Sequence, residues 1–317
     1  KPLINGEKYL EKNSQHMDRG KEIFEKQNID INIDRLLAQR RLYSNAKKVN
    51  YFLIGLTIII PITISFITNF TKMEINEKHW IYVLFTFIAI LLEKIFEVYI
   101  DRCKKTAASI QEDFDTTIFP LKTNELLNTT FVDAEIIRKY SRKDRNNADK
   151  KIKVTNWYSK EIQIIPTNVA ILFCQRMNIC YDQNIKKKYN QLLIFLSILT
   201  FLILLGLALS NEFSVMKFII EVILPSIPIF NFTYKEYNTS FESVDNLQKL
   251  REIIEDNLKS ISINDIIDED ELRRIQDRIY QNRILSPLIP DFIYRILWTK
   301  LEDQMNYSVK TKIEEMQ

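Results

Sequence analysis

The sequence predicts an all-α, polytopic membrane protein with four transmembrane helices in two hairpins and helical cytosolic regions. Four apolar segments carry this prediction, and they cover residues 51–70, 80–100, 192–210 and 213–234. Each is long enough for a helix to cross a hydrocarbon core of about 30 Å. The first and third segments contain no charged residue. Because backbone amides in lipid must be bonded within their own segment, these segments are expected to be helices.

The polar remainder of the chain hides this pattern in whole-chain averages. Of the 317 residues, 27% are charged, and the mean hydropathy is -0.15. A buried core helix is the alternative explanation for any one apolar segment, but core helices are usually shorter and carry a polar stripe. Four such segments in one chain favour a membrane protein.

The distribution of lysine and arginine predicts the orientation of the spans. Basic residues flank the span ends that adjoin the three long polar regions, and they are Arg40, Arg41, Lys47, Lys48, Arg102, Lys104, Lys105, Lys186, Lys187, Lys188 and Lys235. The short connections 71–79 and 211–212 carry no net positive charge. Because positive charge marks the cytoplasmic side, both termini and the central polar region are expected in the cytosol.

The predicted organisation follows from this topology. We expect cytosolic helical regions at residues 1–50, 101–190 and 235–317. Residues 51–100 form the first transmembrane hairpin, and residues 191–234 form the second. The two hairpins therefore hang from an inner face that holds nearly all of the polar mass.

Helices are expected to continue from the cytosolic regions into the spans. No glycine or proline separates Asp34–Lys48 from the first span, and none interrupts the second span before about Phe114. Near the C-terminus, an amphipathic helix capped by Asp268 or Asp270 precedes a last helix from about Phe292 to Met316.

The prolines of the spans predict local departures from a regular helix. Pro225 has no amide hydrogen, so the carbonyl of Glu221 loses its helical partner, and Pro228 affects the carbonyl of Leu224 in the same way. Such loosened carbonyls could attract cations or form a hinge. Pro61 predicts a kink in the first span.

The composition argues against catalysis. With only Gly6, Gly20, Gly55 and Gly206, the chain has neither a Walker loop nor a dinucleotide fingerprint. The two histidines lie far apart in the sequence, which disfavours a histidine-activated nucleophile and a zinc site. Cytosolic cysteines stay reduced, so disulfides are not expected. We predict that the chain is not an enzyme and has no catalytic residue, metal site or resident cofactor.

Polar side chains inside the spans are candidates for lining a water path. A charge at mid-bilayer costs about 3 kcal/mol, so it tends to face protein or water. The pore-lining candidates, which recur at helical spacing, are Thr57, Ser65, Thr68, Thr86, Glu93, Glu97, Lys217 and Glu221. Alternatively, Glu93 and Glu97 extend to the inner interface, and Lys217 pairs with Glu221. Since one four-helix bundle fills its own centre, a pore requires a homo-oligomer.

Four motifs outside the spans resemble a known family. They are LLAQRRLYSNAK at 36–47, NWY at 156–158, CQRMN at 174–178 followed by Tyr181 and Asp182, and RIQDRIYQNR at 274–283. In this order and spacing, they resemble the SMODS-associated four-transmembrane effector family. The resemblance runs over nearly the whole chain and includes the four-span layout.

The resemblance implies a role in bacterial antiphage defence. Members of the family are encoded beside nucleotidyltransferases that make cyclic oligonucleotides. They are thought to permeabilise the bacterial inner membrane when this messenger appears. The infected cell then dies or stops growing before the phage matures, an outcome called abortive infection. A cyclic nucleotide is therefore implied as the activating or regulating ligand. No catalytic residue is carried over, because the family has none assigned.

A ligand with phosphates and flat bases calls for arginine or lysine forks and aromatic faces. The ligand-binding candidates of these types, together with neighbouring amides and an acid, are Trp157, Tyr158, Gln175, Arg176, Asn178, Asp182, Arg274, Arg278 and Arg283. The alternative is that the two aromatic residues belong to the core, that Arg176 pairs with Asp182, and that the other arginines bond acids of a neighbouring helix.

Two classes of function remain. The first is a ligand-gated, oligomeric effector that disrupts the membrane, and the second is a non-conducting membrane scaffold or sensor that recruits cytosolic partners. Basic residues beside the spans attract anionic lipid at about 1 kcal/mol each. A net charge of +3 does not require a nucleic-acid polymer, so we predict membrane lipid as a partner and neither DNA nor RNA.

Overall fold

The structure is a computed structural model, and it describes residues 19–71, 79–127, 130, 132–210, 214–262 and 267–316. All regular secondary structure in these residues is helical, which confirms the all-α class. The elements are α2 (Arg19–Lys26), α3 (Asp30–Ile54), η1 (Gly55–Ile59), α4 (Ile60–Thr71), α5 (His79–Ile118), α6 (Ala134–Ser141), α7 (Ala148–Ile152), η2 (Lys160–Ile164), α8 (Thr167–Ser210), α9 (Val215–Phe218), η3 (Ile219–Ile223), α10 (Leu224–Ser260), α11 (Glu269–Leu285) and α12 (Asp291–Met316).

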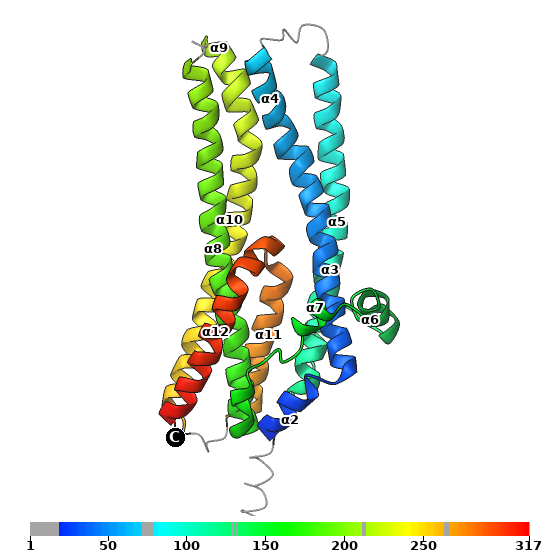
Figure 1. Ribbon diagram of the computed structural model, residues 1–317, viewed down its shortest axis with the longest axis vertical. Helices are drawn as coiled ribbons and strands as arrows, with labels where there is room; N and C mark the ends of the chain where they lie inside the picture. The colour runs from blue at the N-terminus through cyan, green and yellow to red at the C-terminus, as the bar shows by residue number, and fades with distance from the viewer. Residues whose placement is uncertain are drawn as a thin grey trace, which may run out of the picture.

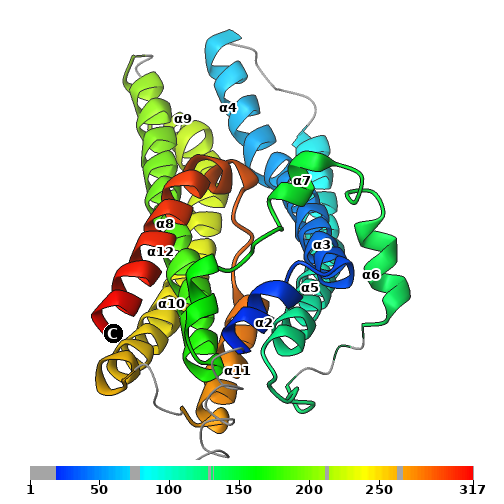
Figure 2. The same cartoon turned by 60° about the horizontal axis from the view of Figure 1, so that its bottom comes forward.

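The long helices form two groups that run side by side along the longest axis of the molecule (Figure 1). In the first group α3, η1 and α4 pack along α5, with α6 on the side of α3. In the second group α8 packs along α10, and α12 lies against α8. Figure 2, with the bottom of the molecule brought forward, shows α2 between the two groups. Helix α11 contacts α5, α8 and α10 and so connects the groups.

Helix α3 passes without a break in helical structure through η1 into α4, as predicted for the first span. Helix α5 continues past the expected Phe114 to Ile118, and the chain turns there because Pro120 follows. Helix α8 has 44 residues and contains no proline. We call the described parts of the polar regions 1–50, 101–190 and 235–317 the polar body. Each of these helices therefore belongs both to the polar body and to an apolar segment.

Two helices are long and apolar enough to cross a bilayer among the described residues, Asp30–Ile64 and Thr167–Ser210. Only 17% and 22% of their most apolar windows are buried. Large apolar side chains such as Phe52, Phe195 and Leu202 are more than half exposed. Exposed apolar surface of this extent favours a membrane environment over the interior of a soluble protein.

Two π-helical turns interrupt the apolar segments, and each is followed closely by a proline. In η1 the amide of Ile60 bonds the carbonyl of Gly55, and in η3 the amide of Leu224 bonds the carbonyl of Ile219. Pro61 and Pro225 cannot donate to the carbonyls four residues earlier, and their rings would clash with them in a regular α-helix. The wider turn relieves this clash, so the local departures predicted at Pro61 and Pro225 take the form of π turns. Pro228 lies inside the α-helix α10 instead.

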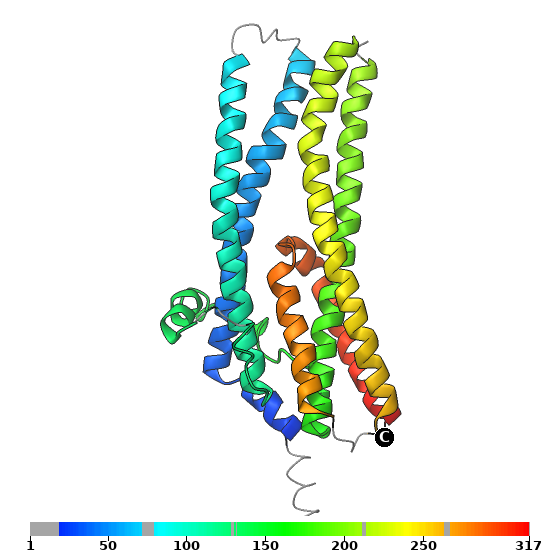
Figure 3. The ribbon, with the colours of Figure 1, turned by 180° about the vertical axis from the view of Figure 1, so that it is seen from behind.

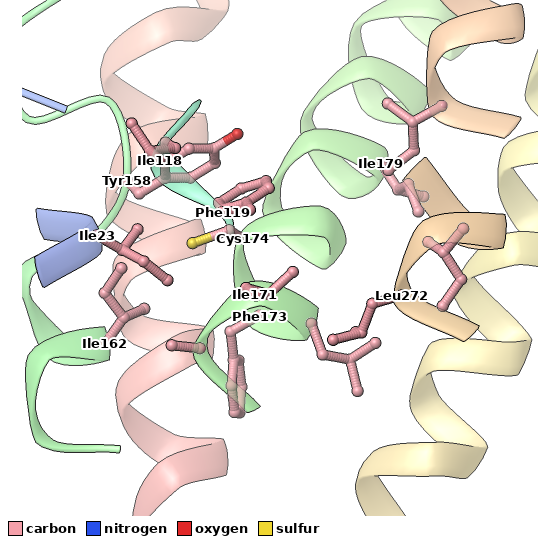
Figure 4. Packing of buried hydrophobic residues seen from close by; sticks show 14 of the residues in the cluster. Ile23, Ile118, Phe119, Tyr158, Ile162, Ile171, Phe173, Cys174, Ile179 and Leu272 are labelled. Carbon is pink, nitrogen blue, oxygen red and sulfur yellow. The ribbon is translucent and has the colours of Figure 1, made fainter. Parts of the chain in front are cut away.

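The N-terminal half of α8 is the axis of the hydrophobic core. All residues from 169 to 176 are buried, which is the pattern of a helix surrounded by other elements. Figure 4 shows Ile171, Phe173 and Ile179 of this helix among side chains from neighbouring elements, including Leu272 of α11. The body therefore holds α8 on every side, whereas the apolar end of the same helix is largely exposed.

The C-terminal elements match the sequence prediction closely. Asp268 caps α11, and its side chain accepts a hydrogen bond from the amide of Asp270 at 3.3 Å. The last helix begins at Asp291, directly after Pro290, and ends at Met316. Pro287 and Pro290 lie between α11 and α12. The chain reverses its direction there, so that α12 descends beside α8 (Figure 1).

We expect Gly20→Ala to destabilise the protein by about 1–3 kcal/mol, because a close backbone approach leaves no room for a side chain. A Cβ atom on Gly20 would lie 2.4 Å from the carbonyl oxygen of Ile165 and 2.5 Å from that of Ile162. Gly206→Ala is the matched control, since its Cβ would meet nothing within 4 Å. Thermal unfolding of both variants in detergent micelles measures the difference, and an unchanged Tm for Gly20→Ala contradicts the packing described.

Candidate functional site

A buried pair of carboxylates occupies the C-terminal end of α5. Glu112 and Asp115 are 1% and 0% exposed, and they lie nearly one turn apart on the face that meets α11. Charged groups are rarely buried this deeply unless they are paired. The structure supplies the partners from α11 and from the segment before η2.

The partners from α11 are cationic or amide side chains. Arg283 Nη1 lies 2.7 Å from Asp115 Oδ2, and Arg273 Nη2 donates to Glu112 Oε1 at 2.6 Å. Gln276 Nε2 donates to Glu112 Oε2 at 2.9 Å and to Asp115 Oδ2 at 3.0 Å. Both carboxylates are therefore compensated by one face of α11.

Tyr158 extends this network to α8. Its hydroxyl donates to Asp115 Oδ1 at 2.7 Å and accepts from Asn178 Nδ2 at 2.8 Å. Its ring lies against Phe114 and Phe119, with ring centroids 6.4 and 5.5 Å away. Figure 4 shows Tyr158 near Ile118 and Phe119, inside the core rather than at the surface.

Burial sets the protonation behaviour of this network. Burial, followed by the neighbouring charge of Asp115, raises the pKa of Glu112 above its ordinary value, although Arg283 and Arg273 oppose the shift. Burial also raises the pKa of Tyr158 well above its ordinary value, so the phenol stays protonated and keeps donating to Asp115. The network fixes α11 against α5 and α8, and none of its members has the geometry of an activated nucleophile.

A second polar network lies nearer the apolar segments and centres on Lys186 of α8. This lysine is 1% exposed, and its Nζ donates to Asp182 Oδ2 at 2.5 Å, to Ser286 Oγ at 2.6 Å and to Ser243 Oγ at 2.7 Å. Asn282 Nδ2 also donates to Asp182 at 3.3 Å. All three ammonium hydrogens are used, so α8, α10 and the end of α11 are held together where the body adjoins the apolar segments.

Arg176 has a different partner from the one considered in the sequence. Its Nε donates to Glu255 Oε1 at 2.8 Å, and Lys312 Nζ lies 2.7 Å from the other oxygen of Glu255. A pair with Asp182 is not formed, because six residues along a helix place the two side chains on different faces. Asp182 instead pairs with Lys186, four residues away.

The structure distributes the predicted ligand-binding residues over several surroundings. Gln175 is fully buried and donates to the carbonyl of Leu272 at 2.8 Å, while Trp157 packs against the main core. Arg274 and Arg278 are exposed on α11. These residues, with those described above, do not come together on one surface. Their role in ligand binding stays a prediction.

The predicted pore-lining residues that the structure describes are placed as follows. Thr57 Oγ1 donates to the carbonyl of Leu53 at 2.8 Å, Glu93 is half-buried, and Lys217 is exposed in α9. Glu97 of α5 pairs with Lys94 at 3.0 Å and with Lys235 of α10 at 2.6 Å, so it links the two groups. The side chains of Ser65, Thr68, Thr86 and Glu221 lie outside the described residues.

The described residues contain no group of three or more histidine, cysteine, aspartate or glutamate side chains that could hold a metal ion. Of the two histidines, His16 lies outside the described residues. Cys103, Cys174 and Cys180 are all buried. Burial raises the pKa of the Cys174 thiol well above its ordinary value, which makes it a poor nucleophile.

Comparison with known proteins identifies the family. Residues 21–312 match the family described as the SMODS-associating 4TM effector domain. The chain belongs to this family. A relative in Bacillus cereus, named a probable CBASS effector molecule, is 28% identical over 294 residues, covering 89% of this chain and 95% of that protein. No solved structure was found to match the chain. The resemblance noted from the motifs is therefore confirmed for this SMODS-associated effector.

Sequence reasoning missed several residues that organise the effector. Glu112, Asp115 and Lys186 were not singled out as partners, although two signals for them exist. Acids three residues apart in a helix share a face, and an acid four residues before a lysine predicts a pair. Neither signal indicates how deeply the groups are buried, which depends on the packing of α11.

We expect Arg283→Met to destabilise the protein by about 3 kcal/mol, because Asp115 would remain buried without its cation. The side chains of Arg283 and Asp115 are 10% and 0% exposed. Arg278→Met, on the exposed side of the same helix, is the control and should change stability by less than about 0.5 kcal/mol. Chemical denaturation in detergent compares the two, and equal effects would contradict the buried pair.

The raised pKa of Glu112 predicts a pH-dependent stability. The folded protein holds this proton more tightly than the unfolded chain, whose ordinary value is 4.5. The ionised carboxylate therefore lowers the free energy of unfolding as the pH rises from about 4.5 through the folded pKa, by at most about 1.4 kcal/mol per pH unit.

Glu112→Gln removes this titration, so the stability of the wild type should fall relative to that of the variant over this pH window. Unfolding curves in detergent from pH 4.5 upwards test this difference. Glu314→Gln on the exposed face of α12 serves as the control. A constant difference between wild type and Glu112→Gln across the window would contradict the buried, destabilised carboxylate.

Proposed function

We propose that the chain is an inner-membrane effector of bacterial antiphage defence that responds to a cyclic nucleotide second messenger. In this proposal several copies assemble and permeabilise the membrane, so the infected cell dies before the phage matures. The messenger is made by a neighbouring nucleotidyltransferase. The chain itself acts without catalysis and binds lipid rather than DNA or RNA.

Membership of the SMODS-associating 4TM effector family over residues 21–312 is the observation that carries this proposal. The Bacillus cereus relative is named a probable CBASS effector molecule. The two names agree on the word effector, and the cyclic oligonucleotide signal in this proposal follows from the family resemblance of the four motifs.

The continuity of the long helices supports a membrane-directed output. Helix α8 has its cytosolic half buried on every side and its apolar end largely exposed, with no break between them. The path α3–η1–α4 and helix α5 likewise join the body to apolar segments. A movement of these helices in the body is therefore transmitted directly along them.

The proposed topology has four spans, in two hairpins, with both termini in the cytosol. The two helices that are long and apolar enough to cross a bilayer, Asp30–Ile64 and Thr167–Ser210, belong one to each proposed hairpin. The apolar ends of α5 and α10 lie beside them (Figures 1 and 3). The polar networks of Asp115 and Lys186 lie in the body, on the side rich in lysine and arginine. This is the side that the positive-inside rule assigns to the cytosol.

Self-association follows from the shape of the spanning region. Four helices per chain leave no wide channel inside one copy, so a leak requires several copies. The outward face of the apolar segments is rich in exposed side chains such as Ile59, Phe195 and Leu202. Such a face suits lipid in a closed state and another subunit in an assembly.

We expect purified protein in dye-loaded liposomes to release the dye when a cyclic oligonucleotide is added. Cyclic dinucleotides and trinucleotides are tested one by one, because the family does not identify the messenger. Liposomes without protein, and linear dinucleotides with protein, are the controls and should show no release. Fluorescence dequenching measures the leak.

If correctly inserted protein releases no dye with any of the cyclic nucleotides tested, the permeabilising role is overturned. That result would favour the alternative, a non-conducting scaffold that recruits cytosolic partners. Chemical cross-linking in the same liposomes tests the assembly separately. A strictly monomeric protein that nevertheless leaks would contradict the homo-oligomeric part of the proposal.

A further inference from the structure

Aromatic and cationic side chains converge where α3 meets α8, the end of α11 and the start of α12. We call this set the junction cluster, and its members are Arg40, Tyr43, Lys47, Tyr181, Arg283 and Tyr294. The connection between α11 and α12 lies between the two groups of helices (Figures 1 and 3). The junction cluster therefore joins residues far apart in the sequence.

The start of α12 is docked on α3 by three contacts. Lys47 Nζ lies 2.5 Å from Asp291 Oδ1 and 4.5 Å from the centroid of the Tyr294 ring. The backbone amide of Asp291 donates to the hydroxyl of Tyr51 at 3.3 Å. These contacts fix the distance between α3 and α12, and they place a cation on an aromatic face.

The other members lie within electrostatic reach of one another. Burial raises the pKa of Tyr43, and the charges of Arg283 and Asp182 also act on its hydroxyl. Burial raises the pKa of Tyr294 as well, with Asp182, Tyr181 and Tyr43 among the neighbours that add to the shift. The phenols of α3, α8 and α12 therefore face a common region that Arg283 of α11 also reaches.

Several polar groups of the junction cluster lack a protein partner. Among the described residues, no hydrogen bond involves the hydroxyl of Tyr43, Tyr181 or Tyr294. Arg283 Nη2 is buried and has no acceptor in the part of the chain that the structure describes. Buried polar groups in folded proteins are nearly always bonded, so the open Nη2 of Arg283 calls for an explanation. The three half-buried hydroxyls beside it are free to bond a ligand or water.

Arg40 adds a cation that is in direct contact with no carboxylate among the described residues, although the charges of Asp291 and Asp144 act on it from further away. Its Nη1 donates to the carbonyl of Lys153 at 3.1 Å, and it forms no ion pair within the described residues. Arg40, Tyr43, Tyr181 and Tyr294 are all half-buried, so each keeps some contact with solvent. The junction cluster is thus enclosed by helices and still accessible.

We propose that the junction cluster is the binding site for the cyclic oligonucleotide, an inference that rests on the proposed function. Arg40 supplies guanidinium donors for one phosphate, through the paired hydrogen bonds that a guanidinium forms with phosphate. Arg283 keeps Nη1 on Asp115 and offers its open Nη2 to the second phosphate. Tyr43, Tyr181 and Tyr294 supply rings for the bases and free hydroxyls for their edges. Base–aromatic stacking contributes about 1–3 kcal/mol per base.

The location of the junction cluster explains how binding would reach the membrane. A ligand held by α3 on one side and by α8 and α12 on the other touches both groups of helices. Each group carries one hairpin, so a change in their separation moves the hairpins relative to each other. The ligand shifts this equilibrium only if it fits one separation better than the other.

Binding of fluorescently labelled cyclic di-AMP, cyclic di-GMP and cyclic tri-AMP to the purified full chain in detergent tests the site. We expect Arg40→Gln to weaken the binding of the nucleotide that binds best by about tenfold or more, the usual effect of losing a charged hydrogen bond. Tyr43→Phe removes only an unbonded hydroxyl, so it should preserve the Tm and still weaken binding severalfold.

Two further variants make the test specific. Tyr307→Phe is the matched control, because Tyr307 lies on the same helix as Tyr294 and is 71% exposed. It should bind as the wild type does. Arg278→Gln tests the alternative site, because the sequence predicted Arg278, on the exposed face of α11, as a ligand-binding residue. Loss of binding in Arg278→Gln together with wild-type affinity in Arg40→Gln and Tyr43→Phe would overturn the proposal.

The leak assay separates failure of this site from failure of the proposed function. If a nucleotide opens wild-type and Arg40→Gln liposomes at the same concentration, the site is elsewhere and the function stands. If no nucleotide of the panel binds the wild type in detergent, the junction cluster is not a nucleotide site. If Arg40→Gln liposomes need tenfold more nucleotide than the wild type but reach the same maximum dye release, the result supports both the binding site and the proposed function.

Discussion

The buried ion pair between Asp115 and Arg283 is the constraint on which the packing of the polar body depends. Neither group can lose its partner without leaving a charge in the protein interior, so α11 must stay against α5. Tyr158 and Gln276 donate to the two oxygens of Asp115, whereas Nη2 of Arg283 has no acceptor among the described residues. Because Tyr158 also bonds a residue of α8, the same pair fixes the central helix of the core.

A second constraint acts where the body adjoins the membrane. Lys186 is almost fully buried and uses all its hydrogens on groups from α8, α10 and the residue after α11. The second group of helices is therefore rigid at this level. The first group meets it through α11, the start of α12 and the pair between Glu97 and Lys235, and also through packing of α4 and η1 against α10 and η3. The contacts between the groups are nevertheless fewer than those within them. Relative motion of two rigid groups is the natural response of such a structure to a ligand.

The long helices could be predicted from the sequence, whereas the contacts between them could not. Hydrophobic periodicity and the positions of proline predicted the continuity of α3 into α4, the cap at Asp268 and the start of α12 after Pro290. The partner of Arg176 could not be predicted, because Glu255 lies on a helix whose packing against α8 has no local signal. Tyr158 shows the same limit, since an aromatic residue in a polar segment suits a binding surface as well as a core. The junction cluster was missed because its members come from four helices and no single motif contains them.

The π turns give the apolar segments a property that length and hydropathy do not express. Each of these turns holds one residue more than the hydrogen-bonding pattern of an α-helix accommodates. In an α-helix one residue corresponds to a rotation of about 100°. Helix α4 is therefore turned about its axis relative to α3, and the same is true of α9 relative to α10. The π turns beside Pro61 and Pro225 thus decide which side chains of α4 and α9 a neighbouring molecule would meet.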